Sequence, residues 1–163
     1  MPDRPGLRPT PERVRETLFN WLGQDLTGWR VLDAFAGSGA LGFEAASRGA
    51  AEVVLLERDA TLVRSLQASR ERLHATTLVV TGAEALAWMA RSAPDRFDLV
   101  LLDPPFDAGL LDRALALAAP LVVPGGFVYA ELGAPLAAPP AGLEPWRQLR
   151  AGAVFACLLH RAS

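Results

Sequence analysis

Apolar residues follow two alternating patterns along the chain, and this alternation predicts the fold class. Short, continuous apolar runs typical of buried strands alternate with longer segments whose apolar residues recur at helical spacing. The predicted strands cover residues 30–35, 51–57, 76–80, 97–103 and 125–132, and the predicted helices cover about 11–22, 39–49, 60–73, 83–91 and 108–119. Buried strands separated by helices are typical of a parallel sheet covered on both faces. We therefore expect an α/β fold.

The last part of the chain departs from this alternation. The proline-rich stretch GAPLAAPPAGLEP is typical of a loop, and the segment PWRQLRAGAVFACLLHR beside it predicts a closing antiparallel hairpin. The length of 163 residues suits one domain with a substantial core. We expect a single domain over 1–163, made of an N-terminal helical segment at 1–28, a cofactor-binding and catalytic core at 29–131 and a C-terminal hairpin at 132–163.

Composition and charge exclude several classes of protein. No apolar run approaches the roughly 18 residues of a membrane span, and no charged-then-apolar leader opens the chain, so we expect a soluble, cytoplasmic protein without a membrane partner. The net charge of −2 argues against holding nucleic acid by bulk charge alone. A single cysteine, Cys157, excludes an intrachain disulfide and lies in an apolar run typical of the core. We expect a monomer with no metal.

A glycine-rich loop follows the first predicted strand. In LDAFAGSGALG, Gly37, Gly39 and Gly42 form the spacing G-x-G-x-x-G between a strand and a helix, as a nucleotide-type cofactor loop requires. Glu57 ends the next predicted strand, where a carboxylate can accept both hydroxyls of a ribose. The alternative interpretation is a tight turn beside a solvated strand end. Because ligands collect at the carboxyl ends of parallel strands, we expect one cofactor site here.

Asp33, near the end of the first predicted strand, separates two classes of cofactor. A dinucleotide places its pyrophosphate against the glycine loop and the helix N-terminus, where a nearby carboxylate would repel it. S-adenosylmethionine has no phosphate and carries an ammonium and a sulfonium, which an acid at this position attracts. The sequence therefore favours S-adenosylmethionine over a dinucleotide.

The run LLDPPF ends a predicted strand in a carboxylate, two prolines and an aromatic ring. Because proline lacks an N–H and holds the preceding residue extended, Asp103, Pro104 and Pro105 present acceptors with few competing donors. The exocyclic amino group of a nucleobase is a poor nucleophile, since its lone pair is delocalised into the ring. Accepting both of its hydrogens would free that lone pair for a methyl group, while Phe106 stacks on the base. The alternative interpretation is a rigid turn with Phe106 in the core.

The segments RPTPERVRETLFNWL, VLDAFAGSGALGFEAASRGA and DLVLLDPPF, in that order, resemble the bacterial RsmD family of class I S-adenosylmethionine-dependent methyltransferases. The resemblance implies a Rossmann-like, seven-stranded, mostly parallel sheet with helices on both faces and an antiparallel last strand. It also implies methylation of the exocyclic N2 of a guanine, with 16S ribosomal RNA or an assembling small ribosomal subunit as partner. The implied catalytic residues are Asp103, Pro104, Pro105 and Phe106, and the implied cofactor-binding residues are Asp33, Ala36, Gly37, Ser38, Gly39, Glu57 and Arg58.

Two segments depart from the family pattern. Where the family commonly has Asp-Ala-Leu contacting the adenine, this chain reads TGAEAL, and Glu84 is the substitute by register. The family usually begins with a basic, glycine-containing arm, whereas this chain opens almost directly at PDRPGLRPT, so we expect the RNA-docking arm to be missing. Arg8 and Arg13 are the candidate substrate-binding residues, as a phosphate-contacting edge; the alternative is a solvated helix face.

Other functions stay open at this point. The Asp-Pro-Pro-Phe motif serves any planar amino group, so an N6-adenine DNA methyltransferase is the nearest enzyme alternative. A non-catalytic, S-adenosylmethionine-binding ribosome-assembly factor is a second alternative, and it would bind the cofactor without transferring a methyl group. A dehydrogenase would require NAD binding, against which Asp33 argues.

Overall fold

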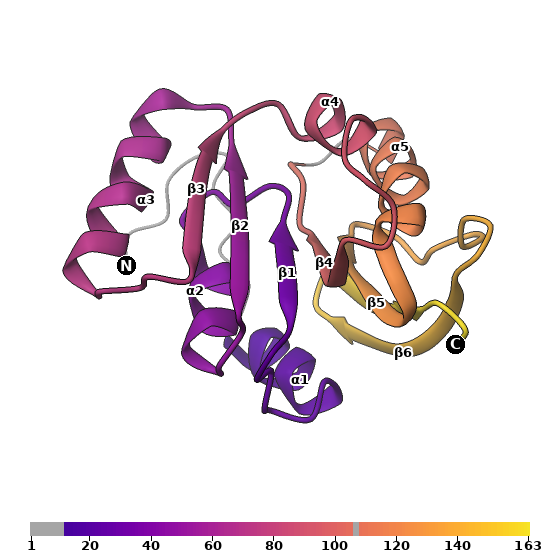
Figure 1. Ribbon diagram of the computed structural model, residues 1–163. Coiled ribbons are helices and arrows are strands. Elements are labelled where there is room, and N and C mark those ends of the chain that lie inside the picture. Colours follow the sequence, from indigo (N-terminus) through magenta and orange to yellow (C-terminus); the bar gives the residue numbers. More distant parts are fainter. Residues whose placement is uncertain (1–11, 106–107) are drawn as a thin grey trace.

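A seven-stranded sheet organises the chain in the computed structural model, which describes residues 12–105 and 108–163 (Figure 1). The strands are β1 Arg30–Asp33, β2 Glu52–Glu57, β3 Leu78–Gly82, β4 Phe97–Leu102, β5 Val122–Leu132, β6 Glu144–Ala151 and β7 Val154–His160. The helices are α1 Glu12–Trp21, α2 Ala40–Ser47, α3 Ala60–Arg72, α4 Ala85–Ala90 and α5 Ala108–Ala118, followed by the 3-10 turn η1 Ala119–Leu121.

The strand order is β3-β2-β1-β4-β5-β7-β6, and it confirms the predicted sheet. The five strands β1 to β5 are parallel, whereas β7 runs antiparallel to both β5 and β6. The closing hairpin is therefore β6 and β7. β5 begins at Val122, three residues before the predicted start, and α4 is shorter than predicted because the side chain of Glu84 caps its N-terminus.

The helices divide between the two faces of the sheet because successive strand residues point to opposite sides. On one face, Leu32 and Val100 belong to a buried cluster that includes residues of α4 and α5. On the other face, Val31 and Leu99 belong to a second cluster that includes residues of α1, α2 and α3. Figure 1 shows α4 and α5 side by side over the β4 and β5 half of the sheet. Within the described residues, no helix is long and apolar enough to cross a membrane.

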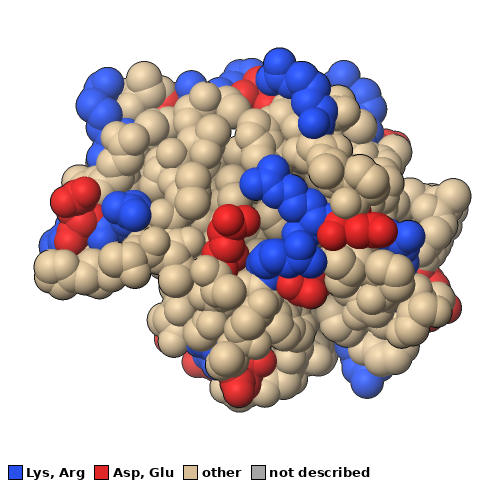
Figure 2. Space-filling view, viewed as in Figure 1, with Lys and Arg blue, Asp and Glu red and all other residues tan. Residues whose placement is uncertain are grey.

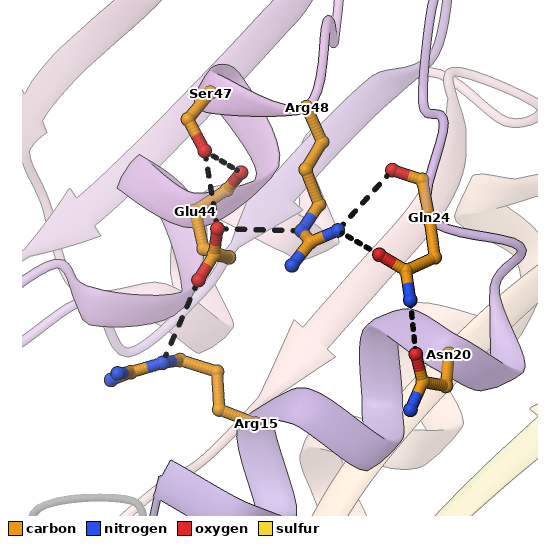
Figure 3. A network of polar contacts seen from close by, with 6 residues as sticks. All are labelled: Arg15, Asn20, Gln24, Glu44, Ser47 and Arg48. Carbon is orange, nitrogen blue, oxygen red and sulfur yellow. Dashed lines mark hydrogen bonds and ion pairs between the residues drawn. The ribbon is translucent and has the colours of Figure 1, made fainter.

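A polar network joins α1 to α2 (Figure 3), and it consists of Arg15, Asn20, Gln24, Glu44, Ser47 and Arg48. Arg48, just past the end of α2, donates to Gln24 Oε1 at 2.8 Å and lies 3.3 Å from a carboxylate oxygen of Glu44. Its guanidinium also lies over the ring of Phe19, 4.9 Å from the centroid. These contacts fix α2 against α1, and α2 carries the glycine-rich loop at its opposite end.

Gly39 begins α2 in a left-handed conformation, with φ at +84°. A Cβ at this position would lie 2.7 Å from a side-chain carbon of Leu66 and 2.7 Å from a ring carbon of Phe43. Gly28 has nearly the same backbone angle, φ +85°, but nothing lies within 4 Å of a Cβ built there. Gly28 therefore needs to be a glycine for its backbone angle alone, whereas Gly39 needs to be one for both its backbone angle and its packing.

We expect Gly39→Ala to lower the free energy of unfolding more than Gly28→Ala. Both variants lose about 1–2 kcal/mol from a left-handed alanine. Only Gly39→Ala adds overpacking against Leu66 and Phe43, which typically costs about 1–3 kcal/mol more. Urea denaturation of both variants measures the difference. Equal losses would mean that Leu66 and Phe43 move aside without cost.

Candidate active site

Four neighbouring parallel strands carry an acidic residue at their carboxyl ends. Glu57 ends β2, Asp33 ends β1, Asp103 directly follows β4, and Glu131 is the last residue but one of β5. In an open α/β sheet this edge is where ligands bind. The edge is therefore strongly acidic at the place where a cofactor and a substrate are expected.

The strand register places these side chains on one face of the sheet. Asp33 pairs with Leu101 of β4, and Leu101 pairs with Tyr129 of β5. Since side chains alternate along a strand, Asp103 and Glu131, two positions further on, point to the same face as Asp33. That face is the one covered by α2, whose buried residues share a cluster with Leu101 and Tyr129.

Asp33 is the one buried charged residue among those described, with 2% of its surface exposed. Its Oδ2 accepts a hydrogen bond from the Gly42 N–H at 3.1 Å. The pKa of Asp33 is raised to about 7, chiefly by burial and next by the charge of Asp103. The hydrogen bond from Gly42 lowers this pKa, whereas Glu57 and Glu131 add smaller upward contributions. A positively charged ligand at this edge would favour the ionised form of Asp33.

Gly42, the third glycine of the loop motif, lets α2 approach the sheet. A Cβ at Gly42 would collide with Leu55 of β2 and would lie 3.1 Å from Asp33 Oδ2. The absence of a side chain therefore permits both the close packing of α2 on the strands and the hydrogen bond to Asp33. This is the role that the third glycine has in cofactor loops of this kind.

Glu57 lies directly beside the glycine-rich loop. Its Oε1 accepts from the Gly37 N–H at 3.0 Å, and its Oε2 accepts from the Asp59 N–H at 2.9 Å. These bonds hold the carboxylate in one orientation at the end of β2. Because each carboxylate oxygen has two lone pairs, Glu57 can also accept from the hydroxyls of a ribose.

The remaining predicted cofactor residues differ in their surroundings. Ala36 is buried at the base of the loop, whereas Ser38 and Arg58 are exposed. Glu84 follows β3 and caps α4, where its two carboxylate oxygens accept from Leu86 N–H at 2.8 Å and Ala87 N–H at 3.0 Å. The structure thus gives Glu84 a capping role, and its contact with an adenine stays a prediction.

The predicted catalytic loop is described as far as Pro105. Asp103 and Pro104 are half-buried and Pro105 is exposed, so the loop rises from the sheet edge toward solvent. Phe106 lies outside the described residues, as does Arg8. Arg13 is exposed in the first turn of α1. On the face drawn in Figure 2, acidic and basic side chains are interleaved, which agrees with the small net charge.

Sequence reasoning missed Glu131 and its partner Tyr129. The hydroxyl of Tyr129 donates to Glu131 Oε2 at 2.9 Å. Burial raises the pKa of Tyr129 well above its usual range, and the charges of Glu131 and Asp103 raise it further, so the hydroxyl stays a donor. The signal in the sequence was an acid at the end of the apolar run GGFVYAEL, but a strand-ending acid is equally typical of a solvated position.

The part of the chain that the structure describes holds no cluster of metal ligands. Among residues 12–105 and 108–163, no group of three or more histidine, cysteine, aspartate or glutamate side chains could hold a metal ion. Cys157 is buried, as predicted, and burial raises the pKa of its thiol to about 11. Its thiol is therefore protonated near neutral pH.

Known proteins resemble this chain over most of its length. The family model described as conserved hypothetical protein 95 matches residues 1–160. Ribosomal RNA small subunit methyltransferase D of Escherichia coli is 44% identical over 72% of this chain, although that match spans 59% of the relative's own length. The protein of the same name from Haemophilus influenzae is 40% identical over 77% of this chain and 68% of its own.

The solved structure of Escherichia coli yhhF shares the fold. It superimposes with a TM-score of 0.88 at 37% identity, covering 98% of this chain and 90% of that one. The chain therefore belongs to the conserved hypothetical protein 95 family, which is the RsmD family of ribosomal RNA small subunit methyltransferase D proteins.

Proposed function

We propose that this protein transfers a methyl group from S-adenosylmethionine to the exocyclic N2 of a guanine in 16S ribosomal RNA. The observation that carries the proposal is the edge at which Asp33, Glu57 and Asp103 lie together, with the acceptor-rich Asp-Pro-Pro segment beside them. The names of the relatives support ribosomal RNA of the small subunit as the substrate. The RNA is offered to the site either alone or in an assembling small subunit.

The residues present fit S-adenosylmethionine. When bound, it supplies an electrophilic methyl group on a positively charged sulfur. Asp33 and the other carboxylates attract a cation at this edge, since each unit charge nearby favours the opposite sign. Glu57 would accept from the ribose hydroxyls, beside the loop that carries Gly37. Arg58 and Glu84, which follow β2 and β3, would lie on the adenine side of the cofactor.

Asp103 and Pro104 act on the target base. The Asp103 carboxylate and the Pro104 carbonyl accept the two hydrogens of the amino group, which keeps its lone pair out of the ring and available for reaction. As positive charge develops on that nitrogen, Asp103 stabilises it and takes the released proton, directly or through water. A base held in helical RNA must first be splayed out to reach this loop.

The proposal is tested by incubating the protein with labelled S-adenosylmethionine and small-subunit RNA, or partly assembled subunits, that lack the modification. We expect labelled N2-methylguanosine after digestion to nucleosides. DNA run in parallel distinguishes the alternative enzyme, because methylation at adenine N6 would overturn the proposed substrate. Cofactor binding without incorporation into RNA or DNA would favour a non-catalytic assembly factor.

We expect Asp103→Ala to lower turnover on RNA by about 10²–10⁴-fold, because it removes the proton acceptor. Binding of S-adenosylmethionine should change little. The loss of Asp103 removes an attractive charge, but it also lowers the pKa of Asp33, whose ionised form attracts the cofactor. Asp112→Ala, an exposed change on α5, is the control and should keep full activity. Near-normal turnover of Asp103→Ala would contradict the assigned role.

The raised pKa of Asp33 predicts that its ionised form, which increases with pH, lowers the stability of the folded protein but favours cofactor binding. Its pKa is about 7 when folded and near 3.8 when unfolded, so between these values the folded state binds the extra proton and the free energy of unfolding falls as pH rises. The free energy of unfolding of Asp33→Asn, measured relative to wild type, should therefore rise by about 2 kcal/mol from about pH 5 to about pH 8.

The same variant should bind S-adenosylmethionine at least about tenfold more weakly at pH 8, because a charge-assisted interaction is lost. Denaturant unfolding at both pH values and titration calorimetry measure the two effects. A stability difference that does not vary with pH would mean that Asp33 does not titrate in this range.

A further inference from the structure

Glu131 lies next to Asp103 at the same edge of the sheet. Leu102 of β4 pairs with Ala130 of β5, so the residues that follow them, Asp103 and Glu131, are neighbours across two parallel strands. Such strands are about 4.8 Å apart. Both carboxylates act on the same buried groups, Asp33 and Tyr129, which places them in one electrostatic environment.

A buried residue of the same strand fixes the carboxylate of Glu131. Tyr129, whose side chain is fully buried, donates its hydroxyl to Glu131 Oε2 at 2.9 Å. This bond sets the orientation of the carboxylate at the end of β5. Since a carboxylate accepts up to about four hydrogen bonds, Glu131 can accept from a ligand as well as from Tyr129.

Glu131 is half-buried, so part of its side chain is open to a ligand at this edge of the sheet. Its partner across the strands, Ala156 of β7, is small and buried. A base whose amino group lies at Asp103 could therefore bring its neighbouring ring edge to Glu131.

Guanine and adenine present different edges to such a pair of carboxylates. In guanine the N2 amino group lies next to N1–H, so two neighbouring positions donate hydrogens. In adenine the N6 amino group lies next to N1, which has a lone pair and no hydrogen. A second carboxylate beside the Asp-Pro-Pro loop can accept the N1–H of guanine. In adenine the same carboxylate would face the N1 lone pair, which is unfavourable.

We infer that Glu131 is a specificity-determining residue whose carboxylate accepts the N1–H of the target guanine while Asp103 and Pro104 accept its amino hydrogens. The inference rests on the proposed function and deepens it, because it names the residue that selects guanine. The Asp-Pro-Pro segment can accept hydrogens from the amino group of either base, so the selection of guanine depends on Glu131 of the neighbouring strand β5.

The test gives residue 131 a hydrogen-bond donor through Glu131→Gln, and it changes N1 of the target base from a donor to an acceptor. Once the methylated position is mapped, the RNA is prepared with guanine or with 2-aminopurine at that position. 2-Aminopurine keeps the amino group at C2 but has a lone pair at N1. Wild type should prefer guanine in kcat/KM by at least about 100-fold. Glu131→Gln, whose amide can donate to N1 of 2-aminopurine, should reduce that preference at least about tenfold.

Two further variants separate recognition from folding. Tyr129→Phe keeps the buried ring and removes only the hydroxyl that orients Glu131, so it should reduce the preference in the same direction by about threefold. Glu144→Gln changes an exposed carboxylate on β6 and should leave the preference unchanged. The dissociation constant for S-adenosylmethionine should stay within about twofold in all three variants. Glu131→Gln removes an attractive charge, but it also lowers the pKa of Asp33, whose ionised form attracts the cofactor.

The outcomes distinguish the inference from the function on which it rests. If wild type forms no N2-methylguanosine in any RNA or particle, the proposed function fails first. If wild type forms it and neither Glu131→Gln nor Tyr129→Phe alters the preference for guanine over 2-aminopurine, the inference is overturned. A loss of cofactor binding that accounts for the whole loss of activity in Glu131→Gln would also overturn it.

Discussion

The buried carboxylate of Asp33 is the constraint on which the rest of the site depends. Removing a carboxylate from water costs several kcal/mol unless partners compensate for it. The N–H of Gly42 compensates in part, and it reaches Asp33 only because a glycine lets α2 pack directly on Leu55. The other carboxylates at this edge increase the cost of ionising Asp33. A cationic ligand reverses that balance, so cofactor binding and the ionisation of Asp33 are thermodynamically linked.

Parallel pairing converts residues far apart in the sequence into one acidic edge. Each strand contributes one acid at its carboxyl end, and the common register turns these side chains toward α2. The β6–β7 hairpin lies beyond β5, where β7 reverses direction and places Ala156 opposite Glu131. In Figure 1, β1, β2 and β3, the strands proposed to hold the cofactor, occupy the left half of the sheet, and β4 and β5 begin the half proposed for the substrate.

Much of this arrangement was predictable from local sequence signals, because glycine spacing, strand-ending acids and the two prolines act over a few residues. The placement of Glu57 beside Gly37 follows from a spacing that the sequence displays. Glu131 was missed because its neighbour depends on the register between β4 and β5, which contains a shift between Phe97 and Leu99 that no local pattern reveals. The capping role of Glu84 also needed the structure, since it depends on where α4 begins.

Asp103 lies between the positions proposed for the cofactor and for the target base. It lies between Asp33 of β1 and Glu131 of β5, and its charge acts on the buried groups of both strands. A carboxylate accepts a proton only while it is ionised, and the neighbouring acids favour the protonated form of Asp33. The positive charge of a bound cofactor offsets this repulsion. Cofactor binding would therefore favour the ionised form of Asp33, beside the carboxylate proposed to accept the proton.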